Sequence, residues 1–85
     1  MSFSAVVMDI REERRVEGRQ RWQVLLDRTE FGAGDEGSLE AVARSGSRLV
    51  VPVLGAVTEG EEIWLQVEKP LAAGTAVTGR VHGKV

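Results

Sequence analysis

VLLDRTEFGAGDEG, residues 24–37, carries an apolar strand through a polar Asp-Arg-Thr end into a glycine-rich acidic turn. A strand that ends in this way needs a tight change of direction. Glycine permits it, because glycine adopts positive φ angles that other residues resist. We therefore expect Gly32, Gly34 and Gly37 to punctuate a turn with positive backbone angles. The next strand is expected to follow directly.

Segments with a period of two recur on both sides of this stretch, and glycine, proline or a cluster of charges closes each one. That pattern predicts short strands linked by tight turns. Residues 11–20 (REERRVEGRQ) are polar and have no apolar stripe, so we expect them to connect a long twisted hairpin rather than to form a helix. Turns are expected at residues 44–47 and 55–61. The six predicted strands are residues 3–10, 21–27, 38–43, 48–54, 62–68 and 75–81.

Single residues within these segments carry further predictions. Pro52 removes a hydrogen-bond donor from the fourth strand, which predicts an edge position, a bulge or a barrel corner. The fifth strand alternates cleanly and places Trp64 on the face that points away from the core. Leu71 is expected to plug one end of the core. The inward positions predicted on the second, fifth and sixth strands are Trp22, Val24, Leu26, Ile63, Leu65, Val67, Val77, Gly79 and Val81.

Six short strands without a convincing helix predict an all-β fold. The expected architecture is a small closed or partly open six-stranded barrel that forms a single domain over residues 1–85. Closure would remove the exposed edges that make isolated sheets aggregate, and a narrow barrel can be filled by Val, Leu and Ile side chains. No internal repeat, linker or low-complexity segment interrupts the chain.

Composition narrows the classes of protein that the chain can belong to. It contains no cysteine, one histidine and a net charge of −2, so a disulfide framework and a thiolate metal site are excluded. Asp9 breaks the N-terminal apolar run before it could form a signal-peptide core, and no run of about 18 apolar residues could span a membrane. A cytoplasmic protein without membrane contact is expected.

The order of features resembles a known family. The strand FSAVV, the strand VLLDRT followed by a glycine loop, the segment SLEAV and the closing LAAGTAVTGRV are similar to the β-barrel subdomain of alanyl-tRNA synthetase editing domains and their free-standing relatives. The resemblance implies a barrel of the translation-factor type. In that family Leu-Asp-Arg-Thr runs into Phe-Tyr, a glycine-rich segment ending in Gly-Gly-Gln, and then Asp-x-Gly. The matching residues here are Asp27, Arg28, Thr29, Phe31, Asp35 and Gly37.

Departures from the family pattern affect its hydrolytic site. The loop FGAGDEG is shorter than the family loop and lacks the Gly-Gly-Gln element that approaches the mischarged aminoacyl ester. The family's zinc motifs, His-x-x-x-His and Cys-x-x-x-His, belong to an α/β region that would follow Val85. His82 matches neither motif. The resemblance therefore implies a barrel without the catalytic part of the family.

Residues that could carry catalysis are scarce, so we expect no enzymatic activity. A nucleophilic triad needs a base, and the single histidine, His82, lies near the end of the sequence. The carboxylates of residues 35–36 and 59–62 are expected to be solvated, because nothing apolar nearby would raise a pKa. Zinc would need about four nitrogen or sulfur ligands, so we expect no cofactor and no metal beyond weak calcium at the acidic turns.

The Gly32-Ala33-Gly34 segment could present backbone amides to a phosphate. No Lys or Ser/Thr follows at the spacing of a phosphate loop, and Asp35 with Glu36 would repel an anion. We interpret the segment as a structural turn.

Two features indicate binding. The only basic cluster lies on the predicted hairpin, where arginines could grip phosphates, although interleaved glutamates could equally pair with them across the hairpin. An outward tryptophan could stack on a base, contact another chain, or be covered by a segment of the same monomer. The candidate binding residues are Arg11, Arg14, Arg15, Arg19, Arg21 and Trp64.

These observations predict a non-catalytic binding or assembly module. The first hypothesis is a stand-alone barrel, similar to the barrel of tRNA-editing proteins, that contacts tRNA or other RNA, or a protein partner, through the arginine hairpin and Trp64. The competing hypothesis is a structural protein that forms a homodimer through its Trp64 face and has no nucleic-acid role. The third is tRNA-linked hydrolysis that requires a separate catalytic chain.

Overall fold

A computed structural model describes residues 2–16, 18–42 and 45–83, although not the side chains of residues 14–16 and 19. All of its described regular structure is strand, and it contains no helix long and apolar enough to cross a membrane within those ranges. The strands are β1 (Ser2–Val16), β2 (Arg19–Leu26), β3 (Glu36–Val42), β4 (Arg48–Glu59), β5 (Glu62–Val67) and β6 (Ala76–Gly83).

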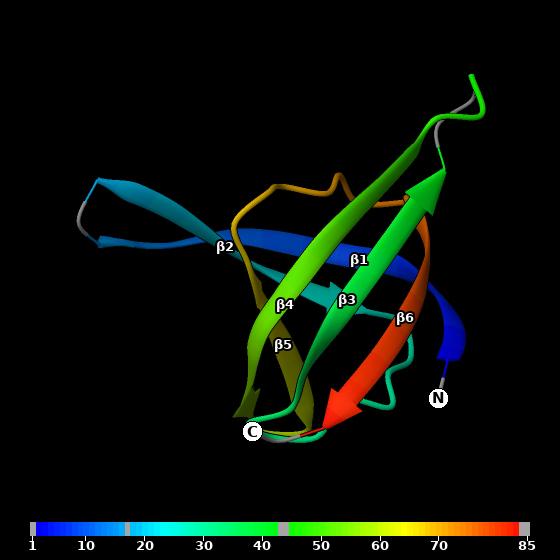
Figure 1. Cartoon of the computed structure of the whole chain (residues 1–85). Helices are drawn as coiled ribbons and strands as arrows, with labels where there is room; N and C mark the ends of the chain where they lie inside the picture. The colour runs from blue at the N-terminus through cyan, green and yellow to red at the C-terminus, as the bar shows by residue number, and fades with distance from the viewer. Residues whose placement is uncertain (1, 17, 43–44, 84–85) are drawn as a thin grey trace.

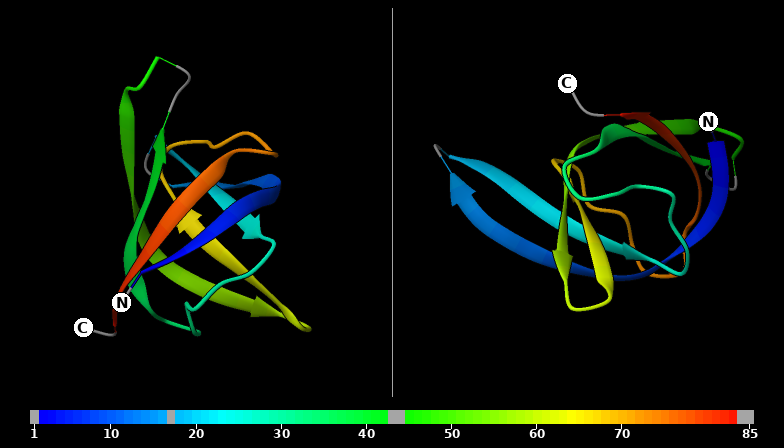
Figure 2. Two further views of the ribbon diagram at one scale, coloured as in Figure 1. Left: turned by 90° about the vertical axis from the view of Figure 1, so that its right-hand side faces the viewer. Right: turned by 90° about the horizontal axis from the view of Figure 1, so that it is seen from below.

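The six strands close into one antiparallel barrel in the order β1-β2-β5-β4-β3-β6. The ring is seen end-on in the right-hand view of Figure 2, and two long hairpins, β1–β2 and β3–β4, extend beyond it in Figure 1. β1 and β6, the first and last strands in the sequence, lie side by side. The predicted all-β, closed six-stranded barrel is confirmed.

β4 forms a corner of the barrel because its two halves pair with different strands. Its first half pairs with β3 as far as Val53, and its second half pairs with β5 from Val53 onward. The register shifts between Val53 and Gly55, which marks a bulge. Pro52 stands just before this bulge, so the predicted irregularity at a barrel corner is confirmed.

β1 changes partner in the same way, and Asp27 fixes the point of change. Ser2–Val6 pairs with β6, and pairing with β2 begins at Val7. Asp27 holds Val6 from both directions: its carboxylate accepts a hydrogen bond from the Val6 N–H at 2.9 Å, and its own N–H donates to the Val6 carbonyl at 3.0 Å. The Asp-Arg-Thr end of the second strand thus ties two strands together.

The long hairpin expected around residues 11–20 is confirmed, because β1 and β2 pair antiparallel as far as Val16 and Arg19. The bounds of two predicted connections were wrong, because both connections are strand for most of their length. β1 continues to Val16 and β2 starts at Arg19, so nearly all of residues 11–20 belongs to the ladder. β4 continues to Glu59, leaving Gly60 and Glu61 as the turn in place of residues 55–61. The end of the predicted third strand and the start of the turn at 44–47 fall on residues 43 and 44, outside the described residues.

The core is built from the positions that the alternation predicts. Leu71 is buried as expected, and Phe3 meets Phe31 edge to face at 5.9 Å between ring centres. Phe31 comes from the loop at residues 27–35, so this loop closes one part of the core. Of the predicted inward residues, Val24, Leu26, Leu65, Val67, Val77 and Gly79 are buried, whereas Trp22, Ile63 and Val81 are partly buried against them.

The three glycines of the opening stretch have three different roles, so the prediction of positive angles at all of them was wrong. Only Gly34 has a positive φ, of 82°. Gly32 donates its N–H to the Asp35 carboxylate at 2.8 Å. Gly37 lies within β3, where a Cβ atom would be only 1.9 Å from the Arg80 carbonyl oxygen. Close approach of two strands, not turn geometry, therefore requires glycine at position 37.

Candidate binding surfaces

Trp64 points out of the barrel, yet it is only 4% exposed. β5 lies between β2 and β4, and Trp64 pairs with Leu25 on one side and Val57 on the other. Its predicted orientation away from the core is confirmed, because it lies outside the cluster of buried core residues. The chain itself covers the indole ring, so this ring is not an exposed platform for a base or a partner.

Arg11 covers the indole. Its guanidinium carbon lies 4.0 Å from the ring centre of Trp64, the geometry of a cation–π contact. The same guanidinium donates to Gln23 at 2.7 Å and to the Glu59 carboxylate at 2.5 Å. Four strands meet here, because Arg11 lies on β1, Gln23 on β2, Trp64 on β5 and Glu59 on β4. Arg11 therefore links β1 to three other strands on the outside of the barrel.

A second set of contacts extends this arrangement. Gln23 donates to the Glu13 carboxylate at 2.6 Å, and Gln66 donates to the same oxygen at 3.1 Å. The sequence pattern missed both glutamines, although each occupies an outward position beside a predicted binding residue. We call Arg11, Glu13, Gln23, Glu59, Trp64 and Gln66 the Trp64 cluster.

The Arg11–Glu59 pair changes the acidity of both groups. The hydrogen bond from Arg11, followed by its charge, lowers the pKa of Glu59 below its ordinary value. The hydrogen bond to Glu59 and the charges of Glu59, Glu62 and Asp9 raise the pKa of Arg11, against a smaller effect of desolvation. Both groups therefore stay ionised at neutral pH. Surrounding carboxylates leave this surface poorly suited to a polyanion.

The indole N–H of Trp64 has no hydrogen-bond acceptor among the described residues. A buried donor without a partner lowers stability, typically by about 1–3 kcal/mol. The contact with Arg11 offsets part of this cost, since the ring face attracts the guanidinium.

The two candidate arginines whose side chains the structure describes have different surroundings. Arg11 is held in the Trp64 cluster, and Arg21 is half-buried in β2, where it pairs with Glu13 of β1. The side chains of Arg14, Arg15 and Arg19 lie outside the described residues. Their backbone belongs to the arm formed by the ends of β1 and β2, which extends away from the barrel in Figures 1 and 2.

The chain uses the backbone amides of the glycine loop for its own contacts. The Phe31 N–H donates to the Thr29 hydroxyl at 3.0 Å, and the Gly34 N–H donates to the Ala56 carbonyl at 3.0 Å. The Asp35 carboxylate accepts from Gly32 and so takes the place that an anion would need. This geometry fits the interpretation of residues 32–34 as a structural turn rather than a phosphate loop.

Groups of three or more metal-ligating side chains are absent from the described part of the chain. His82 is exposed at the end of β6, and the acidic residues of the β4–β5 turn are exposed as well. No polar or charged side chain is buried among the described residues. The described part of the barrel interior is thus apolar.

An exposed apolar surface lies on the outside of β1, β6, β3 and β4. Val42 is 60% exposed, Val50 52% and Val6 38%, and Val6 pairs with Ala76 across the β1–β6 ladder. We call these four residues the outer apolar face. Sequence reasoning missed this face. Its only signal was the run RLVVPVL, which is apolar on both sides of the strand.

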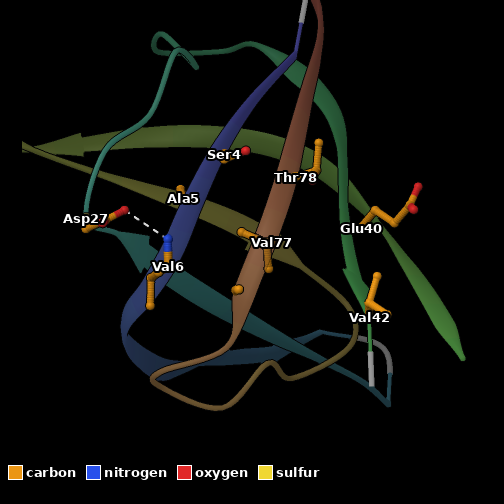
Figure 3. A pocket seen from close by; sticks show the side chains of 9 residues that line it. Ser4, Ala5, Val6, Asp27, Glu40, Val42, Val77 and Thr78 are labelled. Carbon is orange, nitrogen blue, oxygen red and sulfur yellow. Dashed lines mark hydrogen bonds between the residues drawn. The ribbon is translucent and has the colours of Figure 1, made fainter. Parts of the chain in front are cut away.

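A shallow hollow of about 400 Å³ lies over this face (Figure 3). Val6, Ala76, Thr78 and Val42 line it, with the carboxylates of Asp27 and Glu40 at its margins. Asp27 is engaged by the Val6 N–H, as the dashed line in Figure 3 marks. Glu40 lies 3.6 Å from Arg48. The hollow therefore has an apolar floor, and both carboxylates at its margins are engaged within the chain.

A scan against models of known protein families found no match, and a search of curated protein sequences found no similar protein.

Proposed function

We propose that this chain is a non-catalytic assembly module that contacts a protein partner through its outer apolar face. The observation that carries the proposal is the exposure of Val42, Val50 and Val6 on one face of the barrel, where β6 lies between β1 and β3. Exposed apolar side chains gathered on one face are typical of contact surfaces, whereas scattered ones need no explanation. The earlier candidate, Trp64, is the weaker one because Arg11 already covers it.

The resemblance to the barrel of alanyl-tRNA editing domains is part of this proposal. Three residues that match the family pattern stabilise the barrel in this chain. Asp27 links β1 to the end of β2, Phe31 fills part of the core, and Gly37 permits the close approach of β3 and β6. These roles support a shared barrel design and imply no hydrolysis.

A capture experiment tests the protein-partner proposal. The purified chain is immobilised and exposed to an extract of its source cells, and bound proteins are identified by mass spectrometry. We expect Val6→Lys combined with Val42→Lys to lose a partner that the unchanged chain retains, because two desolvated cations would oppose docking. Glu61→Lys in the exposed β4–β5 turn is the control. Equal retention by all three proteins would contradict the proposal.

Binding of RNA through the arm is the second candidate, and the projection of the arm away from the barrel favours it. We expect affinity for tRNA to fall linearly with the logarithm of salt concentration if arginines contact phosphates. Replacing Arg14 and Arg15 by Ala should then weaken binding and reduce the salt slope by about 2. Replacing Arg48 and Arg80 by Ala is the matched control. Absent or salt-insensitive binding would remove this candidate.

A further inference from the structure

The closed ring still leaves strand edges unpaired, and two of them are long because two hairpins extend past the ring. Beyond Val7, β1 pairs only with β2, and from Arg48 to Pro52, β4 pairs only with β3 within the described residues. Both protruding hairpins are visible in Figure 1. An unpaired edge presents N–H and C=O groups to which another strand can add.

The edges of β1 and β4 differ in how well their side chains prevent the addition of another strand. The edge of β1 carries Asp9 and, in succession, Arg11, Glu12 and Glu13, and such charges oppose the approach of another strand. The edge of β4 reads Arg-Leu-Val-Val before Pro52. Leu49 is 39% exposed and Val50 52% exposed. The β4 edge is therefore the one that is open to strand addition.

Pro52 indicates which backbone groups face outward on this edge. Proline has no N–H, so within a sheet it is tolerated where its nitrogen faces the unpaired side. Backbone groups alternate in direction along an antiparallel strand. The N–H and C=O groups of Val50 and Arg48 consequently point to the free edge, whereas those of Leu49 and Val51 point to β3.

We propose that the β4 edges of two copies of this chain pair antiparallel about a two-fold axis at Leu49. The inference deepens the proposed function, and rests on it, by naming a second copy as the partner. Arg48 of one copy then faces Val50 of the other, and each such pair exchanges both of its hydrogen bonds. This register uses the outward backbone groups and leaves Pro52 outside the new ladder.

Charge supports a second copy as the occupant. In the single chain, Arg48 lies 3.6 Å from Glu40, and its side chain is 74% exposed. Glu40 pairs directly with Val50 in the β3–β4 ladder. In the two-fold arrangement, Arg48 of the second copy lies beside Val50, with β4 between it and Glu40, at a backbone separation of about 10 Å that the two long side chains can span. Each copy therefore supplies both the apolar strand and the complementary charge that the other needs.

A pair of charge variants tests both the partner and the register. Val50→Lys places a cation opposite Arg48 of the other copy, whereas Val50→Glu places an anion there. Each dimer contains the pair twice, so we expect dissociation constants to differ by roughly tenfold, with Val50→Glu the tighter. Sedimentation equilibrium over roughly 10 μM to 1 mM suits a small, weak interface. Ala72→Lys in the exposed β5–β6 loop is the matched control, because it adds the same charge away from β3 and β4. Circular dichroism checks that every variant is folded.

Cross-linking gives an independent measurement. The chain has no cysteine, so Leu49→Cys introduces a single thiol. In the proposed register the two Leu49 residues form a non-hydrogen-bonded pair across the axis, a spacing that a disulfide can bridge. Under mild oxidation we expect covalent dimers of Leu49→Cys. Ser4→Cys, which is exposed on β1, should remain a monomer.

Distinct outcomes separate this inference from the proposed function. A single-chain mass throughout that range, equal masses for the two Val50 variants, or equal cross-linking of both cysteine variants would overturn the dimer. If capture through the outer apolar face persists in that case, the proposed function stands with a different protein as partner. If the capture experiment also fails, the proposed function falls with it.

Discussion

Gly37 shows how a single residue can be required without being at a turn. β3 and β6 approach closely where their register shifts, between Glu36 and Gly37. A Cβ atom at position 37 would lie 1.9 Å from the Arg80 carbonyl oxygen and 2.8 Å from the Phe31 ring. Neither neighbour can move freely, since one is backbone in a ladder and the other is a buried core ring.

We expect Gly37→Ala to lower the free energy of unfolding by about 3 kcal/mol, because backbone or core must shift to admit the methyl group. Gly32→Ala is the control. Its Cβ would meet only the end of the Asp35 side chain, at 3.3 Å, so the loss should be below about 1 kcal/mol. Urea denaturation of both variants measures the difference, and similar losses would contradict the model of close strand approach.

At the scale of elements, Arg11 links strands that are not all neighbours. Among the described strands, β1 pairs only with β2 and β6, yet Arg11 reaches β4 through Glu59 and β5 through Trp64. Sequence alternation predicted the outward position of Trp64, and the polar pattern predicted that Arg11 belongs to a hairpin. It could not predict their contact, because that contact depends on how far β1 twists past the barrel.

The lowered pKa of Glu59 gives this link a dependence on pH. A carboxylate with a depressed pKa in the folded state stabilises that state above its ordinary value of 4.5, and this contribution is lost as pH falls through the lowered pKa. We expect the fluorescence of Trp64, measured in a Trp22→Phe background, to shift to the red on acidification from neutral pH to about pH 3. The shift reports release of Arg11.

Glu59→Gln in the same background is the control for that titration. Its side chain cannot titrate, so the red shift in the acidic window should be absent. Indistinguishable titrations in the two proteins would show that another group controls the environment of Trp64.

The same scale shows where pattern reasoning succeeds and where it fails. Alternation located the inward residues of β2, β5 and β6, because burial on one face leaves a period of two in the sequence. It ended β1 and β4 too early. Charged residues such as Arg11 and Glu13 mimic a connection, although they lie in a ladder on an arm with solvent on both sides. Glycine at position 55 suggested a turn where there is a bulge.

Across the whole molecule, the number of strands and the closure of the barrel follow from the sequence, whereas the binding surface does not. Closure needs six strands of suitable length and an interior filled by aliphatic side chains, and both leave marks in the pattern. An exposed face needs strands that are distant in sequence to become neighbours. Val6 and Val42 share a face only because β6 lies between β1 and β3, so no local motif could reveal them.

The pairing of β1 with β6 determines when the barrel can close during synthesis. It joins Ser2 to Arg80, so the first strand of the barrel to be synthesised has no partner on this side until the last strand of the barrel is made. During synthesis the nascent chain therefore presents a temporary open border along β1, and its risk of mispairing lasts until β6 emerges.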